Sequence, residues 1–269
     1  MMPSTDLLQE IDTTARRLAD AARTVILPHF RRQGLAHENK QTEDAFDPVT
    51  VADRGAEAAM RDILHSDRPR DAIIGEEYGV QDGTTGLTWV LDPIDGTRGF
   101  ISGTPTWGVL IAVATEDGPI YGLIDQPYIG ERFIGSALGA HMNGPQGAAT
   151  LETRRGRSIG EATLFTTFPE VGTAADKRCF DAVAQEVQLT RYGMDCYAYA
   201  LLAAGQVDLV IEAGLAAYDI QAPIAVIEAA GGVVTDWSGG PAHNGGRALA
   251  AATPHLHAQA LALMERVAQ

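Results

Sequence analysis

Cysteine, long apolar runs and basic residues are all scarce in this chain, and each shortage argues against a class of protein. The two cysteines, Cys179 and Cys196, form no CxxC pair, so we expect no disulfide framework and a reducing compartment. No apolar run is long enough to span a membrane, and the first residues lack the apolar core of a signal peptide. We therefore expect a cytoplasmic protein with no membrane partner.

Basic residues are outnumbered by acids, with 20 Lys and Arg against 35 Asp and Glu and a net charge of −15. A nucleic-acid partner calls for a basic face, so none is expected. An excess of acids also suits a protein that gathers carboxylates around cations. The 269 residues, 45% of them hydrophobic, can bury a sizeable core as one large domain or two tightly joined ones.

The stretch Trp89–Gly103 brings two acids close to a turn. An apolar run, Trp89–Leu91, ends at Asp92-Pro93, and Asp95 follows three positions after Asp92. Mg²⁺ prefers carboxylate and carbonyl oxygens and shares its remaining positions with water and phosphate. We predict that Asp92, Asp95 and the carbonyl of Ile94 bind metal. The alternative for an isolated DPxD is a surface turn with solvated acids.

The residues after Asp95 offer a place for an anion. Gly96-Thr97 opens a segment that could begin a helix, and the first N–H groups of a helix have no partner within it. The N–H groups of Gly96 and Thr97 are therefore the predicted phosphate site.

Three motifs follow one another along the chain: GEE at Gly75–Glu77, DPIDGTRGF at 92–100 and YDIQAPIAVIEAAGG at Tyr218–Gly232. Together they resemble the inositol monophosphatase superfamily of Mg²⁺-dependent phosphatases, and matching segments run from about Asp47 to Trp237. LIDQPYIGERFIG and YGMDCYAYALLAAGQVDLVIEAGL are similar to the histidinol-phosphatase branch. The resemblance implies an α/β (α+β) fold, layered as an α/β/α/β/α sandwich, and a homodimer.

The resemblance also implies roles for acids that are ambiguous by themselves. Glu76, otherwise a surface charge, and Asp219, otherwise a helix N-cap, become metal ligands beside Asp92, Ile94 and Asp95. Two or three Mg²⁺ ions are implied.

Further residues are implied to serve catalysis or binding. Asp53, which would offset a helix dipole, is implied to hold a water or metal near the site. Glu76 and the Thr97 hydroxyl orient the attacking water. Lys40 reads as a solvated loop lysine, but the resemblance places it close to the metal site.

Two more acids, Asp195 and Glu212, are candidates for binding the substrate. Each could be a cap or a surface charge. Histidinol phosphate, however, carries an ammonium group and an imidazole that carboxylates would pair with, whereas inositol carries hydroxyls.

The expected partner is a small phosphorylated metabolite, and three functions remain open. The first is hydrolysis of histidinol phosphate in histidine biosynthesis. The second is hydrolysis of inositol-1-phosphate or a related sugar or nucleotide phosphate. The third is metal and phosphate binding by a regulator that has lost catalysis.

The order of predicted elements divides the chain. A hairpin turn at Asp117-Gly118 and another turn at Leu138-Gly139 indicate antiparallel strands, whereas strands and helices alternate after Arg157. We predict an N-terminal α+β subdomain (1–157) that carries most metal ligands. A C-terminal α/β subdomain (158–269) supplies Asp219 and the substrate-binding acids.

Overall fold

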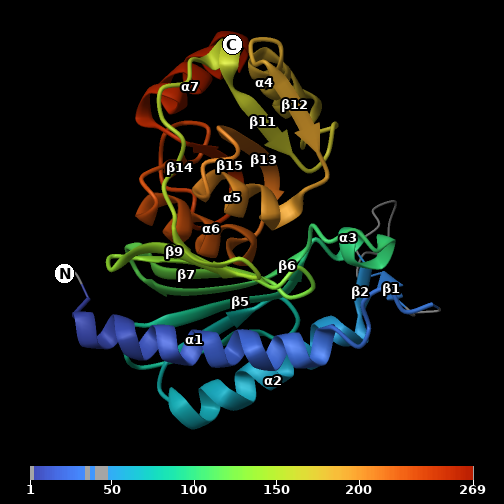
Figure 1. Cartoon of the computed structure of the whole chain (residues 1–269), viewed down its shortest axis with the longest axis vertical. Coiled ribbons are helices and arrows are strands. Elements are labelled where there is room, and N and C mark those ends of the chain that lie inside the picture. Colours follow the sequence, from blue (N-terminus) through green and yellow to red (C-terminus); the bar gives the residue numbers. More distant parts are fainter. Residues whose placement is uncertain (1–2, 34–36, 40–47, 269) are drawn as a thin grey trace.

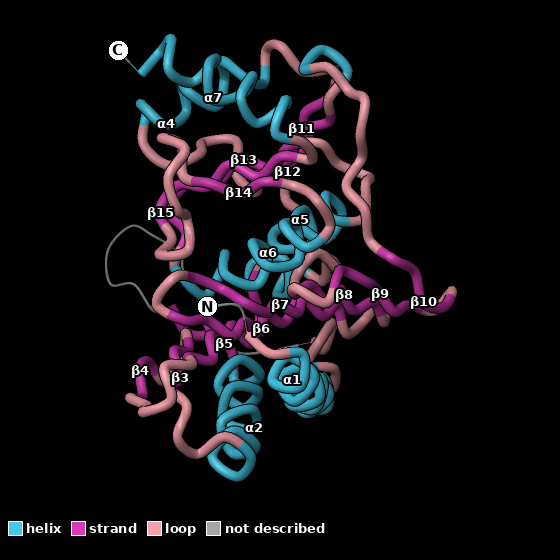
Figure 2. The backbone as a smooth tube through the Cα atoms, turned by 90° about the vertical axis from the view of Figure 1, so that its left-hand side faces the viewer, coloured by secondary structure: helices cyan, strands magenta, loops and turns pink. Residues whose placement is uncertain are grey.

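The computed structural model describes residues 3–33, 37–39 and 48–268, and they form five layers (Figure 1). Helices α1 (Thr5–Ile26) and α2 (Val51–Asp67) cover the outer face of a large sheet. Helices α5 (Asp195–Ala203) and α6 (Ala217–Ala229) lie between this sheet and a smaller one, whose outer face packs against α4 (Ala174–Ala184) and α7 (Pro254–Ala268) (Figure 2). The predicted α/β/α/β/α layering is confirmed. None of the described helices is long and apolar enough to cross a membrane.

The large sheet has the strand order β10-β9-β8-β7-β6-β5-β3-β4 within the described residues. Its neighbours are antiparallel except β3 and β5, which are parallel. The strands are β3 (Ala72–Gly75), β4 (Gly79–Gln81), β5 (Thr88–Asp95), β6 (Gly108–Thr115), β7 (Gly118–Gln126), β8 (Glu131–Ser136), β9 (Gly139–Gly144) and β10 (Gly147–Thr150). Both predicted turns, before Gly118 and before Gly139, are confirmed.

One strand of this sheet leaves no apolar pattern in the sequence. Tyr78–Thr88 has the composition of a loop, but residues 79–81 form the edge strand β4, with Val80 opposite Ile74. Val80 is 71% exposed, so backbone pairing and not burial creates this strand. A sequence pattern based on burial therefore cannot detect it.

The smaller sheet has the order β12-β11-β13-β15-β14 among the residues described. Its strands are β11 (Thr163–Thr166), β12 (Leu189–Tyr192), β13 (Leu209–Leu215), β14 (Val233–Thr235) and β15 (Gly246–Ala251). The remaining elements are the pair β1 (His37–Asn39) and β2 (Pro48–Thr50), the helix α3 (Thr97–Ser102) and the short 3₁₀ helix η1 (Ile159–Glu161). The predicted alternation after residue 157 is present, and the division at that residue stays a prediction.

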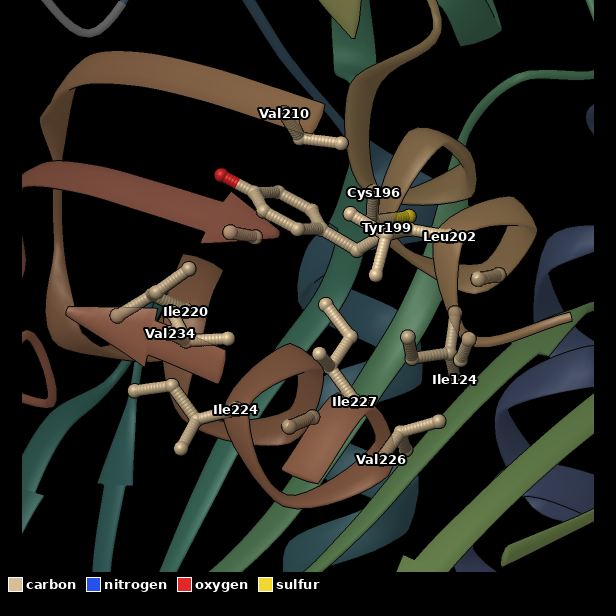
Figure 3. Close-up of a cluster of buried hydrophobic side chains, with 14 of the residues drawn as sticks. Ile124, Cys196, Tyr199, Leu202, Val210, Ile220, Ile224, Val226, Ile227 and Val234 are labelled. Carbon is tan, nitrogen blue, oxygen red and sulfur yellow. The ribbon is translucent and has the colours of Figure 1, made fainter. Parts of the chain in front are cut away.

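A hydrophobic cluster fills the space between the two sheets (Figure 3). It joins Ile124 of the large sheet to Tyr199 of α5, Ile227 of α6 and Val210 of the smaller sheet. Helices α5 and α6 are apolar around most of their circumference, as expected for helices packed on two sides. The middle layer thus holds both sheets in one core.

Helix α6 lies directly on the large sheet because two strands carry glycine beneath it. A Cβ atom on Gly122 would lie 2.3 Å from the carbonyl oxygen of Ala222, and one on Gly135 would lie 2.5 Å from Cα of Val226. Since neither helix backbone atom can move alone, both positions require glycine. This close approach fixes the height of the α6 N-terminus, which carries Asp219, above the sheet.

The segment Asp125-Gln126 holds the rim of the large sheet together. Asp125 is buried and forms ion pairs with Arg132 (2.7 Å) and Arg23 (3.3 Å). The Gln126 side chain accepts a hydrogen bond from the amide of Ile129 (2.6 Å). It also donates one to the carbonyl of Trp107 (3.1 Å), the residue before β6. The two side chains have a structural role.

Candidate active site

Strand β3 ends beside its parallel neighbour β5. Gly75 lies opposite Leu91, and the amide of Glu76 donates to the Leu91 carbonyl (3.2 Å). Glu76, just after the end of β3, and Asp92, within β5, are therefore neighbours, and their carboxyl groups hydrogen-bond to each other. Acids at the carboxyl end of parallel strands occupy the edge where open α/β sheets bind ligands.

Strand β5 contains an irregularity between its two aspartates. Asp92 lies opposite Leu110 but Asp95 lies opposite Gly108, so three steps on β5 match two on β6. The apolar run of the sequence ends at Leu91, but β5 continues through this bulge to Asp95. Pro93 has no N–H to donate to the ladder, and a bulge redirects the side chains that follow it.

Helix α6 completes the cluster from the other half of the chain. One ligand oxygen from each of Asp92, Asp95 and Asp219 lies within 4.8 Å of the others. Asp219 stands in the first turn of α6, where its Oδ2 accepts the amide of Ala216 (2.7 Å). The N-cap residue is Ala216 and not Asp219, so the aspartate caps the helix from within its first turn.

Burial and mutual repulsion act strongly on this cluster. Burial raises the pKa of Asp92 well above its ordinary value, and the carboxylates of Glu76, Asp95 and Asp219 raise it further. Burial, Asp219 and Asp195 likewise raise the pKa of Asp95. A divalent cation would remove this repulsion. The donors are all oxygens, so the site fits a hard cation such as Mg²⁺.

The phosphate site predicted at Gly96 and Thr97 begins α3. Gly96 has a φ of 86°, and a Cβ atom there would lie 2.7 Å from Cγ of Asp195, so glycine is required. The Thr97 hydroxyl lies 3.1 Å from the Ile94 carbonyl and 3.4 Å from Oδ1 of Asp53.

Asp53 lies in the first turn of α2, as predicted, and is only 1% exposed. Its Oδ2 accepts both the amide (2.9 Å) and the hydroxyl of Thr50. Burial raises the pKa of Asp53 to about 6, against the opposing effect of these hydrogen bonds. Asp53 reaches the site through Thr97 and does not line the cavity.

Glu57 holds the turn that follows Glu76, and this role was not predicted from the sequence. It is fully buried and accepts the amides of Glu77 (2.7 Å) and Tyr78 (3.2 Å) and the Arg61 guanidinium (2.7 Å). The sequence pattern that could have predicted this role is a glutamate on the apolar face of a helix with an arginine four residues later. Glu77 itself lies 3.8 Å from Arg54 and is not part of the acid cluster.

A cavity of about 390 Å³ opens over the cluster, within the range of small-molecule sites. Nearly all predicted site residues line it: Glu76, Asp92, Ile94, Asp95, Gly96, Thr97, Asp195, Glu212 and Asp219. Lys40 lies outside the described residues. Side chains that were not predicted also line the cavity, namely Arg98, Thr167, Phe168, Tyr199 and Tyr218.

The two candidate substrate-binding acids have different surroundings. Glu212, in β13, accepts the amide (2.7 Å) and hydroxyl (2.9 Å) of Thr167, and burial raises its pKa to about 7. Asp195 has a φ of 46° at the start of α5 and accepts the Thr106 hydroxyl (3.2 Å). Burial raises the pKa of Asp195 to about 6, although Thr106 and the charge of Arg98 oppose this.

Several known proteins are similar to this chain in sequence and in fold. The model of the inositol monophosphatase family matches residues 7–269. The bifunctional phosphatase IMPL2 of Arabidopsis thaliana is 43% identical over 86% of this chain, and the match spans 66% of the Arabidopsis protein. A histidinol-phosphatase of Streptomyces coelicolor is 35% identical over 94% of this chain and 96% of its own length. The structure of an inositol monophosphatase from Zymomonas mobilis superposes with a TM-score of 0.84 at 39% identity, covering 98% of this chain and 100% of that one.

Proposed function

Because this chain belongs to the inositol monophosphatase family, we propose that it hydrolyses histidinol phosphate to histidinol and phosphate with the help of Mg²⁺. The family consists of metal-dependent phosphatases that act on small phosphorylated substrates. The single observation that carries the proposal is the convergence of Asp92, Asp95 and Asp219 in one cavity, beside the Thr97 hydroxyl.

The metal site would comprise Glu76, Asp92, Asp95 and Asp219 with the carbonyl of Ile94, and two or three Mg²⁺ ions are proposed. When bound, such ions activate water at neutral pH and neutralise charge on the leaving oxygen. The donor set suits this role because four carboxylates in one buried cluster repel one another without a cation.

The chain's own groups position the reactants. The N–H groups of Gly96 and Thr97 donate hydrogen bonds to the phosphate oxygens. Fixed donors of this kind stabilise charge that develops during the reaction. The Thr97 hydroxyl, together with Glu76, orients the attacking water. Asp53, whose carboxylate lies 3.4 Å from that hydroxyl, holds Thr97 in place.

The choice of substrate rests on the acids away from the metal site. Histidinol phosphate carries an ammonium group and an imidazole, and a buried carboxylate binds such a group by a charge-assisted hydrogen bond. Arg98 acts electrostatically on Asp195, so part of the Asp195 charge is already balanced. Glu212, which in the described part of the chain accepts hydrogen bonds from the hydroxyls of Thr166 and Thr167 and from the Thr167 amide, is the stronger candidate for the substrate's cation.

A second candidate substrate is inositol-1-phosphate, which the similarity to the Zymomonas mobilis inositol monophosphatase favours. Phosphate release from the two substrates, measured side by side with Mg²⁺, separates the candidates. We expect kcat/KM to be at least about tenfold higher for histidinol phosphate, the effect of about one charge-assisted hydrogen bond. No release from either substrate, with metal still bound, would point instead to a regulator that has lost catalysis.

Substitution of Glu212 tests the basis of this selectivity. Glu212→Gln keeps the size of the side chain and removes the charge, so it should lower the preference for histidinol phosphate. Glu186→Gln, at an exposed position outside the cavity, is the matched control. An unchanged preference in Glu212→Gln would assign the recognition of the substrate to other residues.

A further inference from the structure

Phe168 exposes an aromatic ring at a cavity that is otherwise lined mainly by acids and small residues. The residue follows β11, lines the cavity and is 43% exposed. Its neighbour Thr167 is fixed by two hydrogen bonds to Glu212. The backbone that carries the ring is therefore anchored to the cavity wall.

Arg98, which also lines the cavity, contacts the same ring. Its guanidinium carbon lies 4.8 Å from the centroid of the Phe168 ring, within the range of a cation–π interaction. Arg98 directly follows Thr97 of the phosphate site and also lies near the charge of Asp195. The ring of Phe168 is thus in contact with the residue that directly follows the predicted phosphate site.

The other aromatic side chains of the cavity differ in their surroundings. Tyr199 also lines the cavity but is only 3% exposed, and its ring packs in the hydrophobic cluster between the sheets (Figure 3). Tyr218 is half-buried beside Asp219. Phe168 is therefore the aromatic side chain with the largest described surface available to a ligand in this cavity.

The polarity of the cavity gives the substrate a direction. With its phosphate at the acid cluster and at Gly96-Thr97, the rest of the substrate would contact the other lining residues, which include Glu212 and Phe168. Carboxylates can bind the ammonium group, but they offer no surface to a flat ring. The face of a phenyl ring attracts both aromatic rings and cations.

We propose that Phe168 is a substrate-binding residue that stacks against the imidazole of the substrate, with Arg98 holding the phenyl ring in position. This inference rests on the proposed function and extends it to the choice among phosphomonoesters. Phe168 makes the cavity prefer alcohols that carry an aromatic ring over aliphatic ones with the same ammonium group.

The test compares histidinol phosphate with phosphoethanolamine, which has the phosphate and the ammonium group but no ring. Phe168→Leu keeps an apolar side chain and removes the ring. It should lower the ratio of kcat/KM for histidinol phosphate to kcat/KM for phosphoethanolamine roughly tenfold, mainly because KM for histidinol phosphate rises. Phe168→Trp, which restores a ring, should return the ratio to within about threefold of the wild-type value.

A matched control is available elsewhere on the surface. Tyr128 is 49% exposed and has the Arg31 guanidinium 4.5 Å from its ring centroid, but it does not line the cavity. Tyr128→Leu should leave the ratio unchanged. An equal loss in this control, or an unchanged ratio in Phe168→Leu, overturns the inference while the proposed function stands. Wild-type protein that releases no phosphate from histidinol phosphate overturns both.

Discussion

The backbone amide of Cys196 donates a hydrogen bond to Oδ2 of Asp95 across 2.6 Å. This contact joins the start of α5, in the second half of the chain, to the end of β5, in the first. Asp95 is thus oriented by a partner that lies 101 positions further along the sequence. The acid cluster is a product of tertiary structure, although three of its members are close together in the sequence.

Loss of one cluster carboxylate should abolish turnover while leaving the fold intact. Asp92→Asn removes a ligand oxygen and a negative charge, and we expect kcat to fall by at least roughly 10²–10³-fold. Because the Asp92 charge is destabilised by burial and by Glu76, the variant without metal should unfold at the wild-type temperature or above. Phosphate release and thermal unfolding with and without Mg²⁺ measure both effects. Substantial remaining activity would refute the assignment, and Asp117→Asn, in an exposed turn, is the control.

The Thr97 hydroxyl should matter for kcat more than for KM. Thr97→Ala removes the group that lies between Ile94 and Asp53, and a fall of roughly 10²-fold in kcat is expected for a group that positions the attacking water. Thr97→Ser keeps the hydroxyl and should recover most of the activity. Equal activity of the two variants would exclude a role for the hydroxyl.

A methyl group added beneath α6 should affect the metal site at a distance. Gly135→Ala places a Cβ atom 2.5 Å from Cα of Val226, so α6 must shift. We expect a loss of about 2–3 kcal/mol of unfolding free energy and a higher Mg²⁺ concentration for half-maximal activity, since α6 carries Asp219. Gly160→Ala, whose Cβ would meet its nearest atom at 3.9 Å, should change neither quantity. Denaturant unfolding and Mg²⁺ titration of both variants decide the matter.

Asp71 should make stability depend on pH in acid. It is 3% exposed and accepts hydrogen bonds from Arg68 (2.7 Å), Thr85 (2.6 Å) and Trp89 (3.0 Å). These contacts lower its pKa in the folded protein, although burial opposes them. Its contribution is therefore fully present above the unfolded pKa of about 3.9 and is lost as the pH falls through the folded pKa.

Asp71→Asn measures this contribution. We expect the variant to be about 2 kcal/mol less stable at pH 7 and the difference to shrink below about pH 4. Urea unfolding at pH 7, 4 and 3 gives the comparison. A difference that stays constant down to pH 3 would show that the charge of Asp71 is not what stabilises the fold.

Local patterns in the sequence were enough to find most elements and most acids of the cavity. The turn at Asp117-Gly118, the acids at the carboxyl ends of β3 and β5, and the alternation after residue 157 each have a short-range cause. Residues that depend on distant contacts were not found. Strand β12 is one example, since Leu189 and Tyr192 are 48% and 45% exposed and leave no apolar pattern. Glu57 is another, because the two backbone amides that it accepts lie 20 and 21 positions away.

The position of α6 in the middle layer implies that neither half of the chain can work alone. The strands of the large sheet deliver Glu76, Asp92 and Asp95, but Asp219 arrives on a helix that follows β13 in the sequence and rests on β7 and β8. A chain cut between β10 and η1 would yield two fragments, each with a large apolar face bare and an incomplete set of oxygen donors. If the two fragments are mixed and associate, we expect phosphate release to return. Measuring phosphate release would therefore detect complementation of the fragments.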